Sequence, residues 1–403
     1  MPEPVTTAVN EVSEVTTSRP DLAPSPRYRP LPKPSVIALD AKPYPNSPPA
    51  FAIRIVLFLR GLFRRLFNLV APPELVLLEA SMGVANTALL AAAARHRFAD
   101  LLEGGPKSAA EIAGATGLDA DAVFRTMRAL AATGVFALGA DSRFSNNRLS
   151  RAMRGGTLSR TREFLVYAGS GSNLGAWAAH EHALATGESP FDHVHGMNVW
   201  EWFEDHPDEQ ELFAHCMMGM TTLDAPVIAS LYPFGEVKSV CDVGGGRGAL
   251  LSELLIRHPH LRGVLADGAG VLASAEGLLT ARGVRDRVEL TVSSFFDEVP
   301  AGADAYLMKN ILHDWDDPTC IRILEVVRAA MRPKTKLVLC ELFLPVLTGE
   351  PLFAISDMQM MVACARGRER SQEELERLVV AAGFQVGRAF PSPTISMLEA
   401  IAP

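Results

Sequence analysis

The sequence predicts an α/β domain in the C-terminal part of the chain, preceded by an all-helical domain. A β-branched run at 238–243 enters a turn with four glycines in five residues, and leucines at helical spacing follow over 249–257. Short apolar runs typical of strands recur at 262–266, 288–292, 303–308 and 336–341. The segment 73–154 is instead alanine-rich, with helical periodicity.

Residues 1–50 have the composition of a disordered, Pro-rich extension. They are dense in Pro, Ser, Thr and Glu, and they contain almost no large apolar side chains before Tyr28. Such a segment buries too little apolar surface to offset the entropy of ordering it. It also has no signal-peptide pattern.

The segment 51–72 is abruptly apolar but contains Arg54, Arg60, Arg64 and Arg65, which predicts an amphipathic helix. A membrane-spanning helix is disfavoured, because each arginine near the bilayer centre costs about 2.5–3.5 kcal/mol. We favour packing on the helical domain of its own or a partner subunit. Peripheral membrane contact through 51–70 stays open as an alternative.

The alanine-rich segment predicts a winged helix. We expect one long helix over Leu75–Ala93, a short second helix that begins at a capping box of Ser108 and Glu111, and a third helix over 119–132. The apolar side chains of the third helix share one face: Val123, Met127, Leu130 and Ala131. A short hairpin over 136–144 would form the wing.

A winged helix raises a second class of function, the DNA-binding regulator. Recognition helices normally present a basic face, but 119–132 offers only Arg125 and Arg128 against Asp119 and Asp121. The chain also has a net charge of −8. We therefore expect no nucleic-acid partner, and a salt-dependent gel shift with DNA would contradict this.

The glycine turn predicts a site for a nucleotide-like ligand, because glycine permits positive φ and lets a ligand approach bare backbone at a helix N-terminus. Asp267, about 20 residues further on, stands where an acid binds a ribose hydroxyl pair. Gly244, Gly246 and Ala249 also fit the NAD pattern. Asp242 favours S-adenosylmethionine, because a carboxylate repels a pyrophosphate but attracts an ammonium or a sulfonium.

Four motifs follow one another in a specific order. They are Asp242-Val-Gly-Gly-Gly-Arg-Gly248, Met308-Lys-Asn-Ile-Leu-His-Asp-Trp-Asp-Asp317, Cys340-Glu341 and Gly367-Arg-Glu-Arg-Ser371. From about residue 75 to the C-terminus, the sequence resembles the S-adenosylmethionine-dependent O-methyltransferases of the plant caffeate and bacterial secondary-metabolite type.

This resemblance implies the architecture and the assembly. We expect a Rossmann-like seven-stranded methyltransferase sheet in 231–403 and a winged-helix dimerisation domain in 73–154. The helical linker 155–230 would cover the substrate site. The family forms homodimers in which each subunit closes part of the partner's site.

The resemblance also implies residue roles. His313 would be the general base, and Glu341 and Glu369 would hold its ring. S-adenosyl-L-methionine would contact Asp242, Gly244, Gly246, Asp267, Phe295, Lys309 and Thr221. Ser294 stands where the family usually has an Asp, and its hydroxyl would accept a hydrogen bond from the adenine amino group.

The acceptor site is expected in the linker and in the C-terminal domain. The predicted substrate-binding residues are Phe164, Tyr167, Asn173, Trp177, Phe213, Met217, Asn310 and Met360. Methionines cluster at 217–220 and 358–361, and flexible thioethers adapt to irregular apolar ligands. The prediction is a roomy apolar pocket with Asn310 as its polar determinant. About half of these apolar residues would instead be ordinary core.

The residue types fit methyl transfer to a hydroxyl. A sulfonium methyl is already electrophilic, so the enzyme must align an oxygen and remove its proton, and the chemistry requires no metal. The five cysteines lack C-x-x-C spacing, which favours the cytoplasm. The predicted function is O-methylation of an apolar, aromatic metabolite. N-methylation, C-methylation and non-methylating use of the same cofactor remain alternatives.

Overall fold

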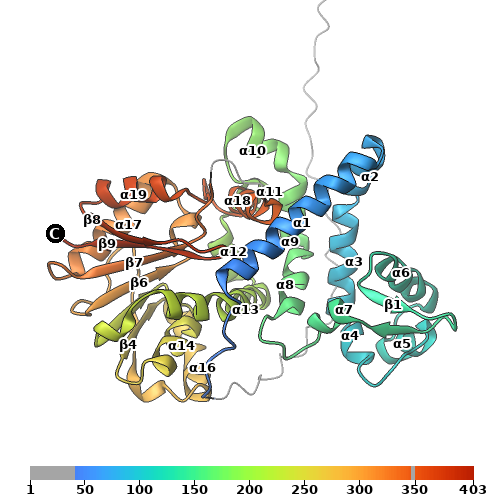
Figure 1. Cartoon of the computed structure of the whole chain (residues 1–403), viewed down its shortest axis with the longest axis horizontal. Coiled ribbons are helices and arrows are strands. Elements are labelled where there is room, and N and C mark those ends of the chain that lie inside the picture. The colour runs from blue at the N-terminus through green and yellow to red at the C-terminus, as the bar shows by residue number, and fades with distance from the viewer. Residues whose placement is uncertain (1–40, 346–349) are drawn as a thin grey trace, which may run out of the picture. The chain divides into compact units, whose positions relative to one another are not determined.

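The computed structural model describes residues 41–345 and 350–403 (Figure 1). The predicted disorder of the N-terminal extension falls almost wholly on 1–40, outside the described residues. The first described helix is α1 (Ala50–Val70). The helices that follow it are α2 (Pro73–Ser81), α3 (Gly83–Arg95), α4 (Phe98–Leu101), α5 (Ala109–Thr116), α6 (Ala120–Ala132) and α7 (Arg148–Ala152).

The expected single helix over Leu75–Ala93 is divided into α2 and α3. Met82 separates them with ψ 2°, and its N–H donates to the carbonyl of Glu79, three residues earlier, at 3.1 Å. Gly83 follows directly, and glycine is a poor helix former, so a break at this point is tolerated.

The winged-helix elements follow the sequence pattern. Ser108 and Glu111 form the capping box of α5, and Asp119 caps α6. The apolar face of α6 is buried through Val123, Met127 and Leu130. Strand β1 (Phe136–Leu138) pairs antiparallel with β2 (Phe144–Asn146) to form the wing.

After α7, six further α-helices lead from the wing to the sheet. They are α8 (Thr161–Ala168), α9 (Gly171–Ala178), α10 (His180–Thr186), α11 (Pro190–His195), α12 (Val199–Asp205) and α13 (Pro207–Leu231). Helix α13 continues through Pro226, and the side chains of its C-terminal turns are largely buried.

The C-terminal domain contains a seven-stranded sheet of order β5-β4-β3-β6-β7-β9-β8. Its strands are β3 (Ser239–Val243), β4 (Arg262–Asp267), β5 (Val288–Val292), β6 (Ala305–Lys309), β7 (Lys336–Glu341), β8 (Gln385–Phe390) and β9 (Ser396–Ile401). Strands β3 to β7 pair in parallel, and β9 runs antiparallel to both β7 and β8. The predicted number of strands is confirmed.

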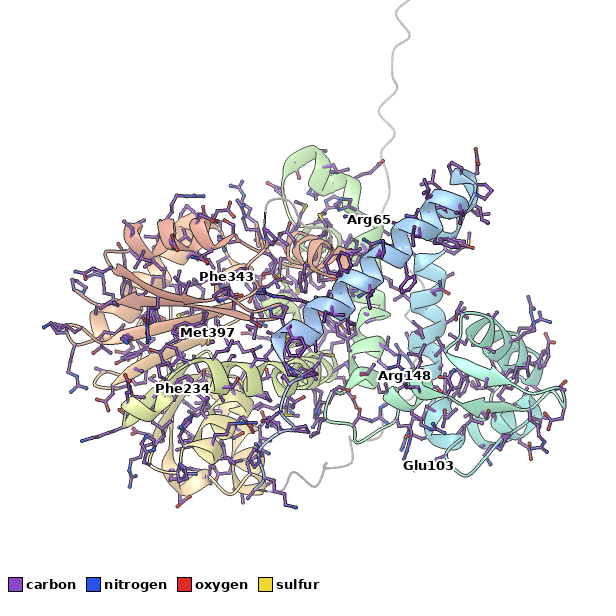
Figure 2. All side chains as sticks on the ribbon, viewed as in Figure 1. Arg65, Glu103, Arg148, Phe234, Phe343 and Met397 are labelled. Atoms are coloured by element: carbon purple, nitrogen blue, oxygen red, sulfur yellow. The ribbon has the colours of Figure 1, made fainter. Side chains whose placement is uncertain are left out.

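Apolar residues at alternate positions of the strands bury two separate clusters, one on each face of the sheet. Val240 and Leu307 pack with leucines of α14 (Ala249–Arg257), whereas Cys241 and Tyr306 pack with other helices. Those helices are α17 (Asp317–Ala330) and α19 (Gln372–Ala381). Figure 2 labels two buried members of the first cluster, Phe234 and Met397.

This topology brings the predicted site residues to one edge of the sheet. The carboxyl ends of parallel strands meet at the same edge, where ligands of open α/β sheets bind. The glycine turn follows β3, Asp267 ends β4, Lys309 ends β6 and Glu341 ends β7. Residues separated by up to a hundred positions therefore belong to one site.

Candidate active site

The glycine turn adopts backbone conformations that other residues rarely reach. The φ angles of Gly244, Gly246 and Gly248 are 67°, 60° and 80°. A Cβ atom on Gly244 would lie 2.7 Å from Cδ1 of Ile311 and 3.4 Å from Cε1 of Phe295. Glycine is therefore required at this position by backbone conformation and by space.

Asp267 is tied to the glycine turn through both of its carboxylate oxygens. Oδ2 accepts a hydrogen bond from the Gly246 N–H at 2.8 Å, and Oδ1 accepts one from the Gly268 N–H at 2.7 Å. Each oxygen keeps a second lone pair, so both can still accept from a pair of ribose hydroxyls. Burial raises the pKa of Asp267, although these backbone donors act against the rise.

Asp242 is only 1% exposed. Its Oδ2 has no hydrogen-bond partner among the residues that the structure describes. Burial and the neighbouring Asp267 raise the pKa of Asp242 to about 7, whereas Lys309 lowers it. A buried carboxylate in this position is stabilised by a cation, so the site fits the ammonium or sulfonium of S-adenosylmethionine.

Lys309 forms a partly buried ion pair with a residue that the sequence analysis missed. Its Nζ lies 3.1 Å from Oδ2 of Asp224 on α13. Thr221 is one helical turn before Asp224, but its hydroxyl donates to the carbonyl of Met217 at 2.8 Å. The sequence did contain a signal for Asp224: its i, i+3 spacing from the predicted cofactor residue Thr221 puts both on the same helix face.

Ser294 uses its hydroxyl within its own turn. Oγ accepts a hydrogen bond from the Phe296 N–H at 3.2 Å. The ring centroids of Phe295 and Phe296 are 4.8 Å apart, and that of Phe296 is 4.9 Å from Trp315. Phe295 therefore lies between the glycine turn and the segment that contains His313.

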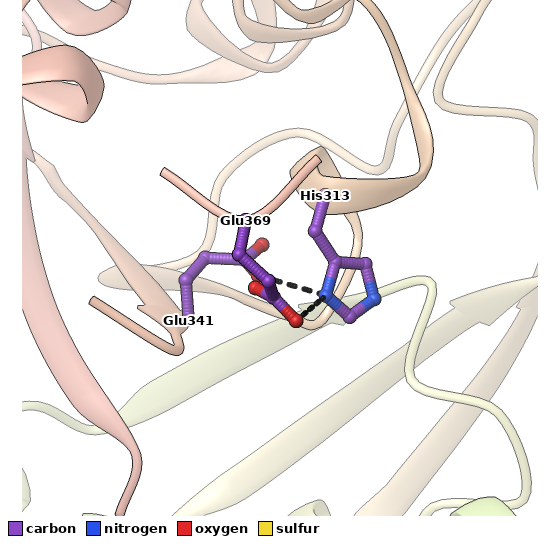
Figure 3. Close-up of side chains that lie close together, drawn as sticks. All are labelled: His313, Glu341 and Glu369. Atoms are coloured by element: carbon purple, nitrogen blue, oxygen red, sulfur yellow. Dashed lines mark ion pairs between the residues drawn. The ribbon is translucent and has the colours of Figure 1, made fainter. Parts of the chain in front are cut away.

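His313 lies in the short helix η3 (Leu312–Asp314) with both predicted glutamates on one side of its ring (Figure 3). Nδ1 is 3.3 Å from Oε1 of Glu369 and 3.7 Å from Oε2 of Glu341. The other ring nitrogen, Nε2, is 3.5 Å from Oδ1 of Asp314. The three residues that the sequence grouped as a base and two acids do meet in space.

The glutamates are themselves held in place. Oε1 of Glu341 accepts hydrogen bonds from the backbone N–H groups of Ile311 and Leu312, at 3.1 and 2.9 Å. Oε1 of Glu369 accepts one from the Ser356 hydroxyl at 3.0 Å. Glu341 therefore holds the backbone that precedes His313 in place, and its other carboxylate oxygen faces the imidazole ring.

The charges around His313 raise the pKa of its imidazole. Burial alone would lower its pKa, but Asp314, Glu369 and Glu341 together raise the pKa to about 10. Burial raises the pKa of Glu341, which His313 in turn lowers. The imidazole is therefore strongly stabilised in its protonated form.

Arg370 is a second residue whose role the sequence analysis missed. The side chain is 3% exposed, and its guanidinium donates to the carbonyls of Leu312 and Trp315, each at 2.7 Å, and to Oδ1 of Asp317. It thereby fixes both ends of the turn that contains His313. Arg370 stands next to Glu369 in a motif of the family, but nothing in the local sequence pattern indicates its partners.

Several predicted substrate residues belong to one aromatic cluster. Tyr167, Trp177 and Phe213 pack around the same buried group of α11, α12 and the helix α18 (Pro351–Ala363). The ring centroids of Tyr167 and Phe213 are 5.4 Å apart. Met217 lies on α13 and Met360 on α18. Phe164 on α8 is 45% exposed in the single chain.

The two predicted polar substrate residues differ. The amide of Asn173 is engaged within the protein, because it donates to the carbonyl of Ala168 at 2.9 Å and accepts from Gln359 at 3.1 Å. Gln359 also accepts from Trp177 Nε1 at 2.8 Å. Asn310, in contrast, follows β6 with a φ of 53°, a left-handed conformation rare for residues other than glycine. Asparagine tolerates this conformation better than most other residues, so the angle indicates a tight turn directly after β6.

The His313 group also has the composition of a metal site. One ligand atom from each of His313, Glu341 and Glu369 lies within 4.8 Å of the others. One nitrogen and two carboxylate oxygens could bind a divalent ion. A base supported by two acids has the same composition, so the two hypotheses require a chemical test.

Comparison with known proteins identifies the family. Residues 173–385 match the O-methyltransferase domain, and residues 78–154 match the O-methyltransferase dimerisation domain. The phenazine O-methyltransferase PhzM of Lysobacter antibioticus is 34% identical over 82% of this chain and 96% of its own. The mitomycin biosynthesis 6-O-methyltransferase of Streptomyces lavendulae is 34% identical over 72% of this chain and 83% of its own.

Solved structures agree with the sequence relatives. The LaPhzM structure has a TM-score of 0.79 and 34% identity, and the alignment covers 83% of this chain and 100% of that one. The neocarzinostatin O-methyltransferase NcsB1, solved with S-adenosylmethionine and 2-hydroxy-5-methyl naphthoic acid, has a TM-score of 0.72 and 30% identity over 81% of this chain and 98% of its own. The chain therefore belongs to the S-adenosylmethionine-dependent O-methyltransferase family, with the dimerisation domain of that family followed by its catalytic domain.

Proposed function

We propose that this enzyme methylates a phenolic hydroxyl of an apolar aromatic metabolite, with His313 as the general base. The observation that carries the proposal is the position of Nδ1, 3.3 and 3.7 Å from Glu369 and Glu341 at the sheet edge that contains the glycine turn. A supported imidazole beside a methyl-donor site fits proton removal from an oxygen nucleophile.

The roles of the two ring nitrogens follow from this arrangement. S-adenosylmethionine supplies an electrophilic methyl group when it is bound. Nδ1 of His313 faces the glutamates, so we assign removal of the acceptor's proton to Nε2, which also lies 3.5 Å from Oδ1 of Asp314. Glu341 and Glu369 stabilise the imidazolium that results, and Arg370 holds the turn so that the ring keeps its orientation.

We propose that the acceptor is a planar aromatic molecule that binds beside the aromatic cluster of Tyr167, Trp177 and Phe213. Aromatic rings pack well against such a surface. NcsB1 was solved with a hydroxylated naphthoic acid, and other relatives act on phenazine and 3-amino-4-hydroxybenzoate. Asn310 remains the proposed polar contact with the acceptor, whereas the amide of Asn173 is already engaged by Gln359 and Ala168.

Nitrogen methylation is the second candidate. The 8-amino-8-demethylriboflavin N,N-dimethyltransferase of Streptomyces davaonensis is 29% identical over 75% of this chain and 88% of its own. A neutral amine is already nucleophilic, whereas a neutral phenol needs deprotonation. The retained His313 group with its two buried glutamates therefore favours a hydroxyl acceptor.

We further propose a homodimer that works in the cytoplasm. The dimerisation domain over 78–154 supports the assembly. The five cysteines are all free and buried, as in a protein of a reducing compartment.

The test uses purified enzyme, labelled S-adenosylmethionine, and paired hydroxylated and aminated naphthoates and phenazines. We expect label on the hydroxylated acceptors, and a His313→Gln rate lower by about 10²–10⁴-fold with nearly unchanged cofactor affinity by calorimetry. His260→Gln, at an exposed histidine, is the matched control. Full turnover by His313→Gln would refute the base, and label on amines alone would establish the second candidate.

A further inference from the structure

Helix α1 lies outside both family matches, which begin at residues 78 and 173. The LaPhzM structure is aligned over 100% of its own chain but only 83% of this one. This chain therefore has residues that the relative lacks. The properties of α1 must be inferred from its own contacts.

The helix turns its more polar side toward the protein. Ile53, Leu57, Gly61 and Arg64 form the half-buried stripe, and no residue of α1 is buried. Arg60 Nη1 lies 3.3 Å from Oε1 of Glu350. The large apolar side chains that remain exposed are Phe51, Ile55, Val56, Phe58, Leu59, Leu62, Phe63, Leu66, Phe67, Leu69 and Val70. We call this set the apolar face of α1.

The chain just before α1 is anchored to the catalytic domain. Tyr44 is 3% exposed, its ring lies 4.0 Å from the guanidinium of Arg282, and its N–H donates to both carboxylate oxygens of Glu253 at 3.1 and 3.0 Å. Arg257 donates to the carbonyl of Tyr44 and to Oδ1 of Asn46, both at 3.0 Å. This anchor holds the first turn of α1 close to its own subunit.

The other end of α1 leads directly into the dimerisation domain. Only Ala71 and Pro72 separate it from α2, which also has no buried residue. The exposed apolar surface continues through Leu75, Leu77, Leu78, Met82 and Val84. The segment Pro73–Arg95 is apolar enough to span a membrane, and only 6% of its most apolar window is buried. An apolar surface this extensive on a soluble domain marks an interaction site.

We infer that the apolar face of α1 packs against the partner subunit and extends the interface formed by the dimerisation domain. This inference rests on the proposed homodimer. Continuity between α1 and the exposed surface of α2 and α3 favours a second copy as the occupant. The net charge of −8 disfavours an anionic bilayer, and the ion pair of Arg60 with Glu350 of its own chain removes one cation from a membrane-facing role.

The experiment compares three full-length proteins by sedimentation equilibrium. The test variant combines Phe58→Glu and Leu66→Glu, at positions 68% and 48% exposed in the single chain. The matched control is Leu184→Glu on α10, where the leucine is 74% exposed. We expect the Kd of the dimer to rise about 100-fold or more in the test variant and to stay unchanged in the control.

Circular dichroism and cofactor binding verify that each variant is folded. A folded test variant with the wild-type dimer Kd would overturn the inference. Sedimentation with phosphatidylcholine–phosphatidylglycerol vesicles is the parallel arm. Vesicle binding that the test variant loses while its dimer Kd is unchanged would reassign the apolar face to a membrane. A monomeric wild type would instead refute the proposed homodimer itself.

Discussion

Nδ1 of His313 lies 3.3 Å from Oε1 of Glu369, and Glu369 is itself buried and bonded to Ser356. This pair joins two segments that are 56 positions apart in the sequence (369 minus 313). The consequence is an imidazole with a pKa raised to about 10, which binds a proton more strongly than ordinary histidine. The pH dependence of the reaction rate should therefore reflect the raised pKa of His313.

Replacing Glu369 by Gln should move the pH–rate profile to lower pH. Glu369 helps to raise the pKa of His313, so its neutral counterpart lets that pKa fall toward its usual range. The measurement is kcat/KM against pH, in which the wild-type rate should still rise toward about pH 10. Glu325→Gln, at an exposed position of α17, is the control. A profile that does not move would contradict the coupling of Glu369 to the base.

Replacing Asp242 by Asn should stabilise the cofactor-free enzyme at alkaline pH. The pKa of Asp242 is about 7 in the folded chain, against an ordinary value of 3.8. The folded state therefore binds the proton more strongly, and stability falls as pH rises between these two values. Asn does not titrate, so the variant avoids this loss.

Thermal unfolding without cofactor, measured at several pH values, tests this expectation. The free energy of unfolding of Asp242→Asn should exceed that of the wild type by a few kcal/mol above pH 7, with the difference shrinking toward acidic pH. Asp286→Asn, at an exposed carboxylate, is the matched control. S-adenosylmethionine should bind Asp242→Asn more weakly. A variant less stable than the wild type at every pH would argue against this account.

Replacing Arg370 by Ala should destabilise the fold and slow catalysis together. The substitution leaves the buried carbonyls of Leu312 and Trp315 without their guanidinium donor. We expect the free energy of unfolding to drop by about 2–5 kcal/mol, and kcat to fall more than the KM for S-adenosylmethionine changes. Arg368→Ala removes only a partly exposed ion pair with Glu374 and should change stability by less than about 0.5 kcal/mol. Equal effects of the two variants would refute the positioning role.

Removing divalent ions should leave turnover unchanged. The ligand atoms of His313, Glu341 and Glu369 are close enough to bind a metal, but transfer of an electrophilic methyl group needs only alignment and proton removal. Activity after dialysis against EDTA, compared with activity in added Mg²⁺ or Zn²⁺, decides between the two roles. Loss of activity that one ion restores would make this group a metal site.

Much of the fold follows from local pattern. The strands were predictable because a strand that is buried on both faces of the sheet reads as a short continuous apolar run, and the helices because of their 3.6-residue period. The capping box at Ser108 was equally readable, since Ser and Glu three residues apart bind each other's backbone. The break at Met82 was not, because the apolar periodicity continues across it.

The sequence by itself determined which chemical groups are available. They are a glycine turn, two acids near the carboxyl ends of strands (Asp242 and Asp267), and a histidine with two matched glutamates. Only the tertiary structure decided what each group does. It brought Asp224 to Lys309 and Arg370 to the turn around His313, and it engaged the amide of Asn173 with Gln359. These partners come from segments that are far apart in the sequence. Long-range packing brings them together, and such packing leaves no local periodicity in the sequence. The same packing leaves the apolar face of α1 exposed in the single chain, although the sequence favoured a helix packed on the helical domain of its own or a partner subunit.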